Sequence, residues 1–323
     1  MVGKVPPDAL SRHVFGRTGA DDDRVLQGPA YGEDAAAVDL GEQTLVVSAD
    51  PLSLAAERVG TFAVPVACND VAASGADPAW LTVVLFVPED DPAVLETVAD
   101  QLDAAATDVG VSIVGGHSEY NPELSRPLLS LTAFGLADRF VPAGGARPGD
   151  RVLLTAGAGI EGTAILASDF RDEGRAAGVS EDVLDRAVGF FDEVSVFPAA
   201  RVLRGSATAM HDPTEGGLVD GLLELAAAAG AVVEVEREAI PVREETRVLC
   251  DAMEVDPLRI FGSGALVAAV PPDDADAALA ALEDAGIRAA DIGAVREGGP
   301  PALVIGGERF EEPVRDDLYT LWA

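Results

Sequence analysis

The stretch "RVGTFAVPVACNDVAASGA" at residues 58–76, followed by "WLTVVLFV" at 80–87, sets the fold of the first half of the chain. The first segment is long and apolar, which indicates a buried helix, and the second is an apolar, β-branched run typical of a buried strand. Further strands are predicted at 43–50, 111–114 and 127–135, and a further helix at 91–110. The order strand, helix, strand, helix, strand, strand predicts an α/β domain.

The length of 323 residues exceeds the size at which a single hydrophobic core usually stops growing, so we expect two domains. The Gly- and Pro-rich segment "VPAGGARPGD" at 141–150 is the best boundary. We therefore predict an N-terminal α/β domain over 1–140 and a C-terminal α+β domain over 151–323. Alternating strands and helices in the second half predict layers in which one face of the sheet is covered.

The composition is strongly acidic, with 56 Asp and Glu against 22 Lys and Arg, a net charge of −34, and Lys4 as the only lysine. Such a field repels nucleic acids and anionic membranes, so neither is an expected partner. Self-repulsion is weakest at high salt, where the Debye length falls to about 3 Å at 1 M. The composition therefore favours a high-salt cytoplasm as the setting of this protein.

Membrane insertion and disulfide bonding are not expected. No apolar run approaches the ~20 residues of a membrane span, and the N-terminus lacks an apolar signal core. Cys68 and Cys250 are too few for a disulfide framework, lie in predicted helices and read as small core residues. We expect a soluble cytoplasmic protein.

A few acidic residues stand in apolar or Gly-rich surroundings and differ from the many surface acids. They are Asp34, Asp50, Asp70 beside Asn69, and Asp212. Each alone is compatible with a helix cap or a core hydrogen bond, but burying an unpartnered carboxylate is costly. Carboxylates, an amide oxygen and Gly-rich turns together suit Mg²⁺ with phosphates, and no Walker-type lysine motif is present.

The segment "VGGHSE" at 114–119 follows the short predicted strand at 111–114. Gly115 and Gly116 allow a positive φ or a close backbone approach, and His117 and Glu119 can bind protons or metal. A tight turn and a ligand-binding loop at the mouth of a strand are both compatible with this pattern.

Seven motifs occur in the order found in the AIR synthase superfamily, and the chain resembles that family over about residues 30 to 300. They are "YGEDAAAV", "SAD", "ACNDVAASGADP", "VGGHSE", "GARPGDRVLLTAG", "MHDPTEGGL" and "IPVREETRVLCDAMEVDPLRIFGSGALVAAV". The C-terminal half is most similar to the hydrogenase maturation branch, HypE. The resemblance implies PurM-like domains, a homodimer in which N-terminal sheets of two subunits close a barrel, and ATP in the cleft between the domains.

The resemblance also implies the site residues and the cofactors, ATP and Mg²⁺. Asp34, Asp50, Asp70 and Glu119 are the expected metal ligands. Asp50, Asp212 and His117 are the expected catalytic residues. The nucleotide is expected to contact Asn69, Gly115, Gly116, His117, Glu119, Thr214, Gly216 and Gly217. Several relatives carry an acid at the position of His117, so either His117 donates to phosphate or Glu119 takes the metal.

Two positions depart from the HypE pattern. The sequence ends in "DDLYTLWA" without the terminal cysteine that receives a carbamoyl group in that branch, and Glu215 stands where the pattern usually has arginine. We therefore expect an ATP-dependent enzyme that transfers or uses the γ-phosphate to activate a small-molecule or amide-type acceptor. The alternative is an ATP-binding regulatory or scaffold protein, of the kind used in metallocentre maturation, without turnover.

Overall fold

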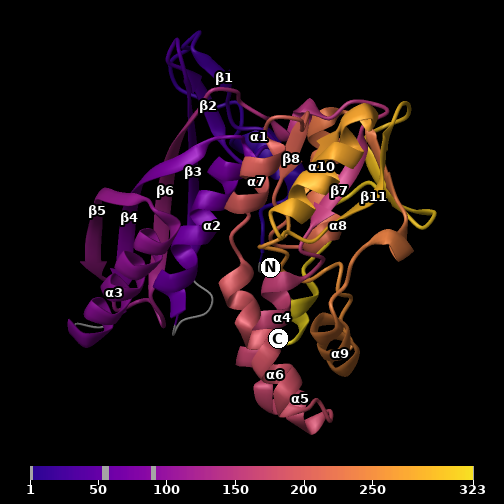
Figure 1. Cartoon of the computed structure of the whole chain (residues 1–323). Helices are drawn as coiled ribbons and strands as arrows, with labels where there is room; N and C mark the ends of the chain where they lie inside the picture. The colour runs from indigo at the N-terminus through magenta and orange to yellow at the C-terminus, as the bar shows by residue number, and fades with distance from the viewer. Residues whose placement is uncertain (1–2, 53–57, 89–91, 323) are drawn as a thin grey trace.

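The computed structural model describes residues 3–52, 58–88 and 92–322, and arranges them around two mixed β-sheets (Figure 1). The first sheet has the strand order β1-β2-β3-β6-β4-β5, and the second has the order β13-β12-β9-β11-β7-β10-β8. The parallel pairs are β4 with β5 and β9 with β12, and the other strand pairings among the described residues are antiparallel. The strands are β1 Val25–Gln27, β2 Ala36–Asp39, β3 Thr44–Leu52, β4 Asp77–Val87, β5 Ser112–Tyr120, β6 Leu128–Ala137, β7 Arg151–Thr155, β8 Ala209–His211, β9 Val232–Val235, β10 Val267–Val270, β11 Ala289–Arg296, β12 Ala302–Ile305 and β13 Glu308–Phe310.

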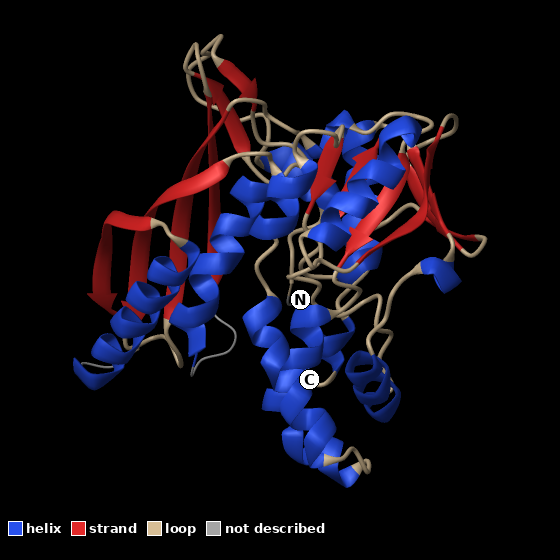
Figure 2. Ribbon diagram, viewed as in Figure 1, coloured by secondary structure: helices blue, strands red, loops and turns tan. Residues whose placement is uncertain are grey.

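Helices cover the first sheet on one face and the second sheet on both (Figure 2). The helices are α1 Pro7–His13, α2 Val59–Ala73, α3 Pro92–Val109, α4 Ile160–Asp169, α5 Arg171–Ala176, α6 Glu181–Val188, α7 Phe197–Leu203, α8 Gly217–Ala229, α9 Glu244–Met253 and α10 Pro272–Asp284. Short 3₁₀ turns are η2 Ala143–Gly145, η3 Gly189–Glu193, η4 Arg237–Ala239 and η5 Asp317–Thr320.

The second sheet differs from the expectation of one covered face. Val152 and Leu154 of β7 pack in the core beneath α8, while Leu153 between them packs in a separate core with α7 and α10. Both faces of this strand are apolar because both are buried, as is usual when helices flank a sheet on two sides. The prediction of a single covered face was therefore wrong.

The predicted elements of the first half are confirmed, with one important change. Strand β5 does not end at residue 114 but runs through "GGHSE" to Tyr120, pairing along its length with β4. The acidic tract at 19–27 ends in β1, which pairs with β2. The extension of β5 arises from its pairing with β4, which local periodicity does not report.

Asn69 ties the first half to the second. It is fully buried in α2; its Nδ2 donates to the Val194 carbonyl at 2.8 Å, and its Oδ1 accepts from the Val196 amide at 2.9 Å. Nearby, the rings of Phe62 and Phe191 lie 4.2 Å apart. A buried side chain that satisfies two main-chain groups of the other half fixes how α2 meets the C-terminal half.

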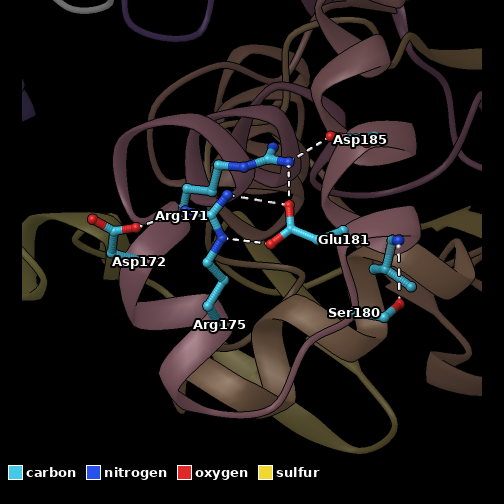
Figure 3. A network of polar contacts seen from close by, with 7 residues as sticks. Arg171, Asp172, Arg175, Ser180, Glu181 and Asp185 are labelled. Carbon is cyan, nitrogen blue, oxygen red and sulfur yellow. Dashed lines mark hydrogen bonds and ion pairs between the residues drawn. The ribbon is translucent and has the colours of Figure 1, made fainter.

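The acidic surface is organised locally by arginines. In the hairpin of α5 and α6, Arg171 contacts Glu181 and Asp185, and Arg175 contacts Glu181 and Asp172 (Figure 3). Ser180 caps α6 by accepting from the Val183 amide. These groups are solvent-exposed, so each pair contributes little to stability, although the network fixes the hairpin.

No helix within the described ranges is long and apolar enough to cross a membrane. The free cysteines Cys68 and Cys250 are buried in α2 and α9, which confirms their prediction as core residues within helices. Burial raises the pKa of the Cys68 thiol to about 12, so this thiol stays protonated at neutral pH.

We predict that Asn69→Ala lowers the free energy of unfolding by about 2–4 kcal/mol, because it leaves a buried carbonyl and a buried amide without partners. Denaturant unfolding in molar KCl measures the loss. The control is Gln43→Ala, since Gln43 donates to Asp138 at an exposed position. Equal small losses in both variants would contradict the role of Asn69 as the tie between the two halves.

Candidate functional site

A cleft of about 770 Å³ lies between the two halves. Both ends of the chain border it: Lys4 lines one part, Tyr319 lines another, and a Cβ added at Gly3 would lie 3.4 Å from the Tyr319 ring. The cleft is lined by Gly3, Lys4, Val5, Gly32, Glu33, Asp34, Asp50, Pro51, Leu52, Phe62, Val66, Asp70, Arg126, Glu161, Ile165, His211, Asp212, Thr214, Glu215, Glu224, Phe261, Ser263 and Tyr319.

Four carboxylates from four segments meet in this cleft, and we call them the acid cluster: Asp34, Asp50, Asp70 and Asp212. Asp34 precedes β2, Asp50 belongs to β3, Asp70 belongs to α2, and Asp212 follows β8. Ser48 of β3 donates to Asp70 Oδ2 at 2.5 Å and so orients that side chain. The fold thus gathers acids that are up to 178 positions apart in the sequence.

Burial and mutual repulsion disfavour full ionisation of the acid cluster. Burial, followed by the charges of Asp50 and Asp212, raises the pKa of Asp70 well above its usual range. Burial and the charge of Asp34 do the same to the pKa of Asp212. As a carboxylate, Asp212 has both oxygens buried without a hydrogen-bond donor among the described residues. Only a shared proton or a bound cation would supply a partner.

A row of alternating charges borders the acid cluster. His211 Nδ1 lies 2.6 Å from Asp34 Oδ1, His211 Nε2 lies 3.1 Å from Glu224 Oε2, and Lys4 Nζ lies 2.8 Å from Glu224 Oε1. Burial disfavours the cationic form of His211, but the two flanking carboxylates overcome this and raise its pKa. Burial likewise disfavours ionised Glu224, yet Lys4 and His211 lower its pKa to about 2. Both cations are thereby held by carboxylates.

The residues present fit Mg²⁺ bound together with phosphate. No three His, Cys, Asp or Glu side chains of the described ranges form a preformed metal site. Mg²⁺ in phosphate-binding proteins commonly takes only one or two carboxylates, with phosphate oxygens and water completing the octahedron. The unpartnered oxygens of Asp212 and the crowded carboxyl groups of Asp50 and Asp70 supply ligands of that kind.

The expected phosphate-side glycines have structural roles instead. Gly216 donates its amide to Asp316 at 3.0 Å, and Gly217 donates its amide to the Thr214 carbonyl at 3.0 Å. Both glycines have positive φ, and a Cβ at Gly217 would lie 2.5 Å from the Ile260 carbonyl oxygen. Thr214 lines the cleft, but the two glycines shape the start of α8 and are not exposed to it.

The "GGHSE" residues also lie outside this cleft within one chain. Gly115, Gly116, His117 and Glu119 belong to β5, whose nine residues are all exposed, and His117 Nε2 lies 3.5 Å from Glu119 Oε2. The two glycines were expected to form a turn or to let the backbone approach a ligand, but the structure shows another reason for glycine at position 116. A Cβ at Gly116 would lie 1.9 Å from the Val83 carbonyl oxygen, so the close backbone approach is between β5 and β4.

Asn69 is a further correction, because both polar atoms of its side chain bind the main chain of the other half and it does not line the cleft. Sequence reasoning also missed cleft residues. Glu33, within the quoted motif "YGEDAAAV", accepts from the amides of Ala143 and Gly144 at 3.1 and 2.9 Å. Glu161, outside the quoted motifs, lies in the first turn of α4. Neither position carries a local signal that distinguishes it from the surface acids.

The comparisons with known proteins agree with this architecture. Residues 32–137 match the family model "AIR synthase related protein, N-terminal domain", and residues 147–306 match the corresponding C-terminal domain. A carbamoyl dehydratase HypE from Rhizobium leguminosarum bv. viciae is 31% identical over 278 residues, covering 82% of this chain and 77% of that protein. A selenide, water dikinase from Nitratidesulfovibrio vulgaris is 31% identical over 331 aligned positions, covering 90% and 91%.

Among solved structures, that of the hydrogenase maturation protein HypE in complex with ATP superposes with a TM-score of 0.71 at 26% identity, covering 95% of this chain and 93% of that one. The fold is therefore PurM-like, with both family domains in the expected order. On the two domain matches and the similarity to HypE, this chain belongs to the AIR synthase related protein family.

Proposed function

We propose that this protein is an ATP-dependent enzyme that transfers the γ-phosphoryl group of ATP to a small-molecule acceptor. The observation that carries the proposal is the acid cluster, in which neither buried oxygen of Asp212 has a donor among the residues that the structure describes, and Asp70 is crowded by further carboxylates. Such a cluster is costly in an empty protein and becomes favourable when cations and phosphate occupy it. Residues of the acid cluster come from both of the segments that match the family models, 32–137 and 147–306.

In this proposal Asp50, Asp70 and Asp212 hold Mg²⁺, with Asp34 oriented beside them by His211. Bound there, Mg²⁺ would neutralise the negative charge of the triphosphate and of the phosphoryl group in the transition state of its transfer. The bond from the γ-phosphorus to the bridging oxygen breaks, a bond to an acceptor oxygen forms, and ADP leaves.

We propose further that the active form is a homodimer built on the first sheet. Opposite the face covered by α2 and α3, this sheet carries half-exposed or exposed apolar side chains: Leu45, Val47, Trp80, Val84, Phe86, Leu128, Phe134 and Leu136. Edge strand β5 adds exposed Ile113, Val114 and Tyr120. An apolar sheet face and an apolar edge are liabilities in a monomer, and pairing with a second copy removes both. A dimer would also give the "GGHSE" strand a route to the nucleotide of the other subunit.

The first prediction separates binding from stability at Asp70. Asp70→Asn should weaken Mg²⁺·ATP binding at least about tenfold, because a charged ligand is lost. It should also raise the unfolding free energy of nucleotide-free protein at pH 7 by about 1 kcal/mol or more, because crowding is relieved. Calorimetry and denaturant unfolding in molar KCl measure the two effects, and Asp276→Asn on the exposed face of α10 is the matched control.

The sign of the pH dependence follows from the raised pKa. Folded protein keeps a proton on Asp70 that the unfolded chain releases above about pH 4, so repulsion lowers stability as the pH rises through the folded pKa. The gain in Asp70→Asn should therefore be present at pH 7 and vanish near pH 3–4. Equal ATP affinity in Asp70→Asn, Asp276→Asn and wild type would overturn the assignment of the cluster.

The second prediction concerns the dimer. Light scattering in molar KCl should give about twice the 33.1 kDa of one chain. Phe134→Glu places a charge between Val47 and Trp80 on the open sheet face and should shift the protein to monomer with an unchanged circular dichroism spectrum. Leu40→Glu, at an exposed position outside this face, should remain dimeric. A monomeric wild-type protein at micromolar concentration would contradict the dimer.

A further inference from the structure

The cleft has a second polar region apart from the acid cluster, and we call it the Glu161 end. Glu161 extends from the first turn of α4, and its side-chain partner is the Ser263 hydroxyl. Asp316, Glu215 and Tyr319 lie on this side, where Tyr319 hydrogen-bonds Glu215. Glu161, Ser263, Glu215, Asp316 and Tyr319 all belong to the second half of the chain, whereas three of the four residues of the acid cluster belong to the first half. The second half thus contributes its own group of acidic and phenolic side chains to the cleft.

Apolar side chains form the wall at the Glu161 end. Ile165 lies one turn along α4 from Glu161, and Phe261 lies two positions before Ser263 in the sequence. The rings of Phe261 and Tyr319 meet edge to face with centroids 5.9 Å apart, and Phe62 lines the cleft from α2. An apolar wall with one partly buried carboxylate suits a ligand that has a flat apolar body and one hydrogen-bond donating group.

The charges of the cleft restrict that donating group. Eight carboxylates line the cleft, namely Glu33, Asp34, Asp50, Asp70, Glu161, Asp212, Glu215 and Glu224, against the cationic side chains Lys4, Arg126 and His211. Lys4 and His211 are already paired with Glu224 and Asp34, at 2.8 and 2.6 Å respectively. Arg126 is exposed and forms no ion pair with another described residue, which suits it to a mobile phosphate. A second anionic ligand would meet net repulsion.

We propose that the Glu161 end is the acceptor pocket, and that the acceptor carries a cationic or N–H-rich nitrogen group on a flat apolar body, with the nitrogen donating to Glu161. This assignment rests on the proposed function, since it takes the acid cluster as the phosphate end. Burial raises the pKa of the Glu161 carboxyl, so an adjacent cation restores its charged form and gains from it. Phosphorylated or carboxylated acceptors are disfavoured by the same charges.

The test uses three probes of similar size and different charge: benzamidine, benzyl alcohol and benzoate. Binding is measured by ligand-observed NMR in molar KCl, on nucleotide-free protein and on protein saturated with Mg²⁺ and the non-hydrolysable analogue AMPPCP. We expect benzamidine to bind at least tenfold more tightly than benzoate in both forms. Glu161→Gln should abolish this preference and leave the affinity for AMPPCP unchanged. Glu283→Gln, an exposed acid of α10, is the control for the loss of one charge and should change neither.

Two results would overturn the inference. One is equal or tighter binding of benzoate. The other is displacement of benzamidine by AMPPCP together with weaker AMPPCP binding in Glu161→Gln, because the Glu161 end would then hold the adenine base. Failure of AMPPCP to bind to wild type would overturn the proposed function alone, since the benzamidine preference is measured on nucleotide-free protein as well. Ser263→Ala, which removes the partner of Glu161 but keeps its charge, should retain the preference and so checks for misfolding.

Discussion

Repulsion among the buried carboxylates of the acid cluster is the constraint on which the rest of the architecture depends. Asp34, Asp50 and Asp70 come from the first half, and Asp212 comes from the second, so this repulsion acts across the junction of the two halves. Something must hold the junction together against it. The Asn69 hydrogen bonds, the Phe62–Phe191 contact and the His211–Asp34 ion pair all cross the same junction. These contacts offset the repulsion of the acid cluster at the junction.

The acidic composition limits the number of cationic side chains available at the cleft. A chain with 22 cationic and 56 acidic side chains has few cations to spare, and its single lysine is placed where Glu224 holds it beside the cleft. Arginines instead stabilise the outer surface, as in the Arg171 and Arg175 network. In many phosphate sites lysine and backbone amides neutralise the ligand. Here the amides of Gly216 and Gly217 at the start of α8 are bound internally, so the proposed function assigns the neutralisation of phosphate mainly to metal ions.

Much of the fold could be predicted from the sequence, because apolar periodicity marks α2, β4, α8 and α10 directly. The acids of the cluster could be predicted as a group, because burying carboxylates in apolar or Gly-rich segments costs free energy unless a cation or a hydrogen-bond donor pairs with them. Roles that depend on distant partners could not be predicted. Asn69 resembles a ligand until Val194 and Val196 are seen beside it. Gly116 resembles a ligand-approach glycine until the Val83 carbonyl is seen against it.

Strand β5 combines exposed apolar side chains with exposed ligand-type side chains. The two glycines, His117 and Glu119 do not end the strand, because β5 continues through them to Tyr120. The close approach of β5 to the backbone of β4 requires a glycine at position 116 only. His117 and Glu119 are left exposed on an edge, with each other as partners. An edge strand with apolar and ligand-type side chains, beside an uncovered apolar sheet face, is more stable in an interface than exposed to water, because an interface buries the apolar surface and pairs the free edge. In the proposed dimer, β5 would both form the subunit interface and bring His117 and Glu119 to the cleft of the other subunit. Loss of the dimer would therefore also remove these side chains from the cleft.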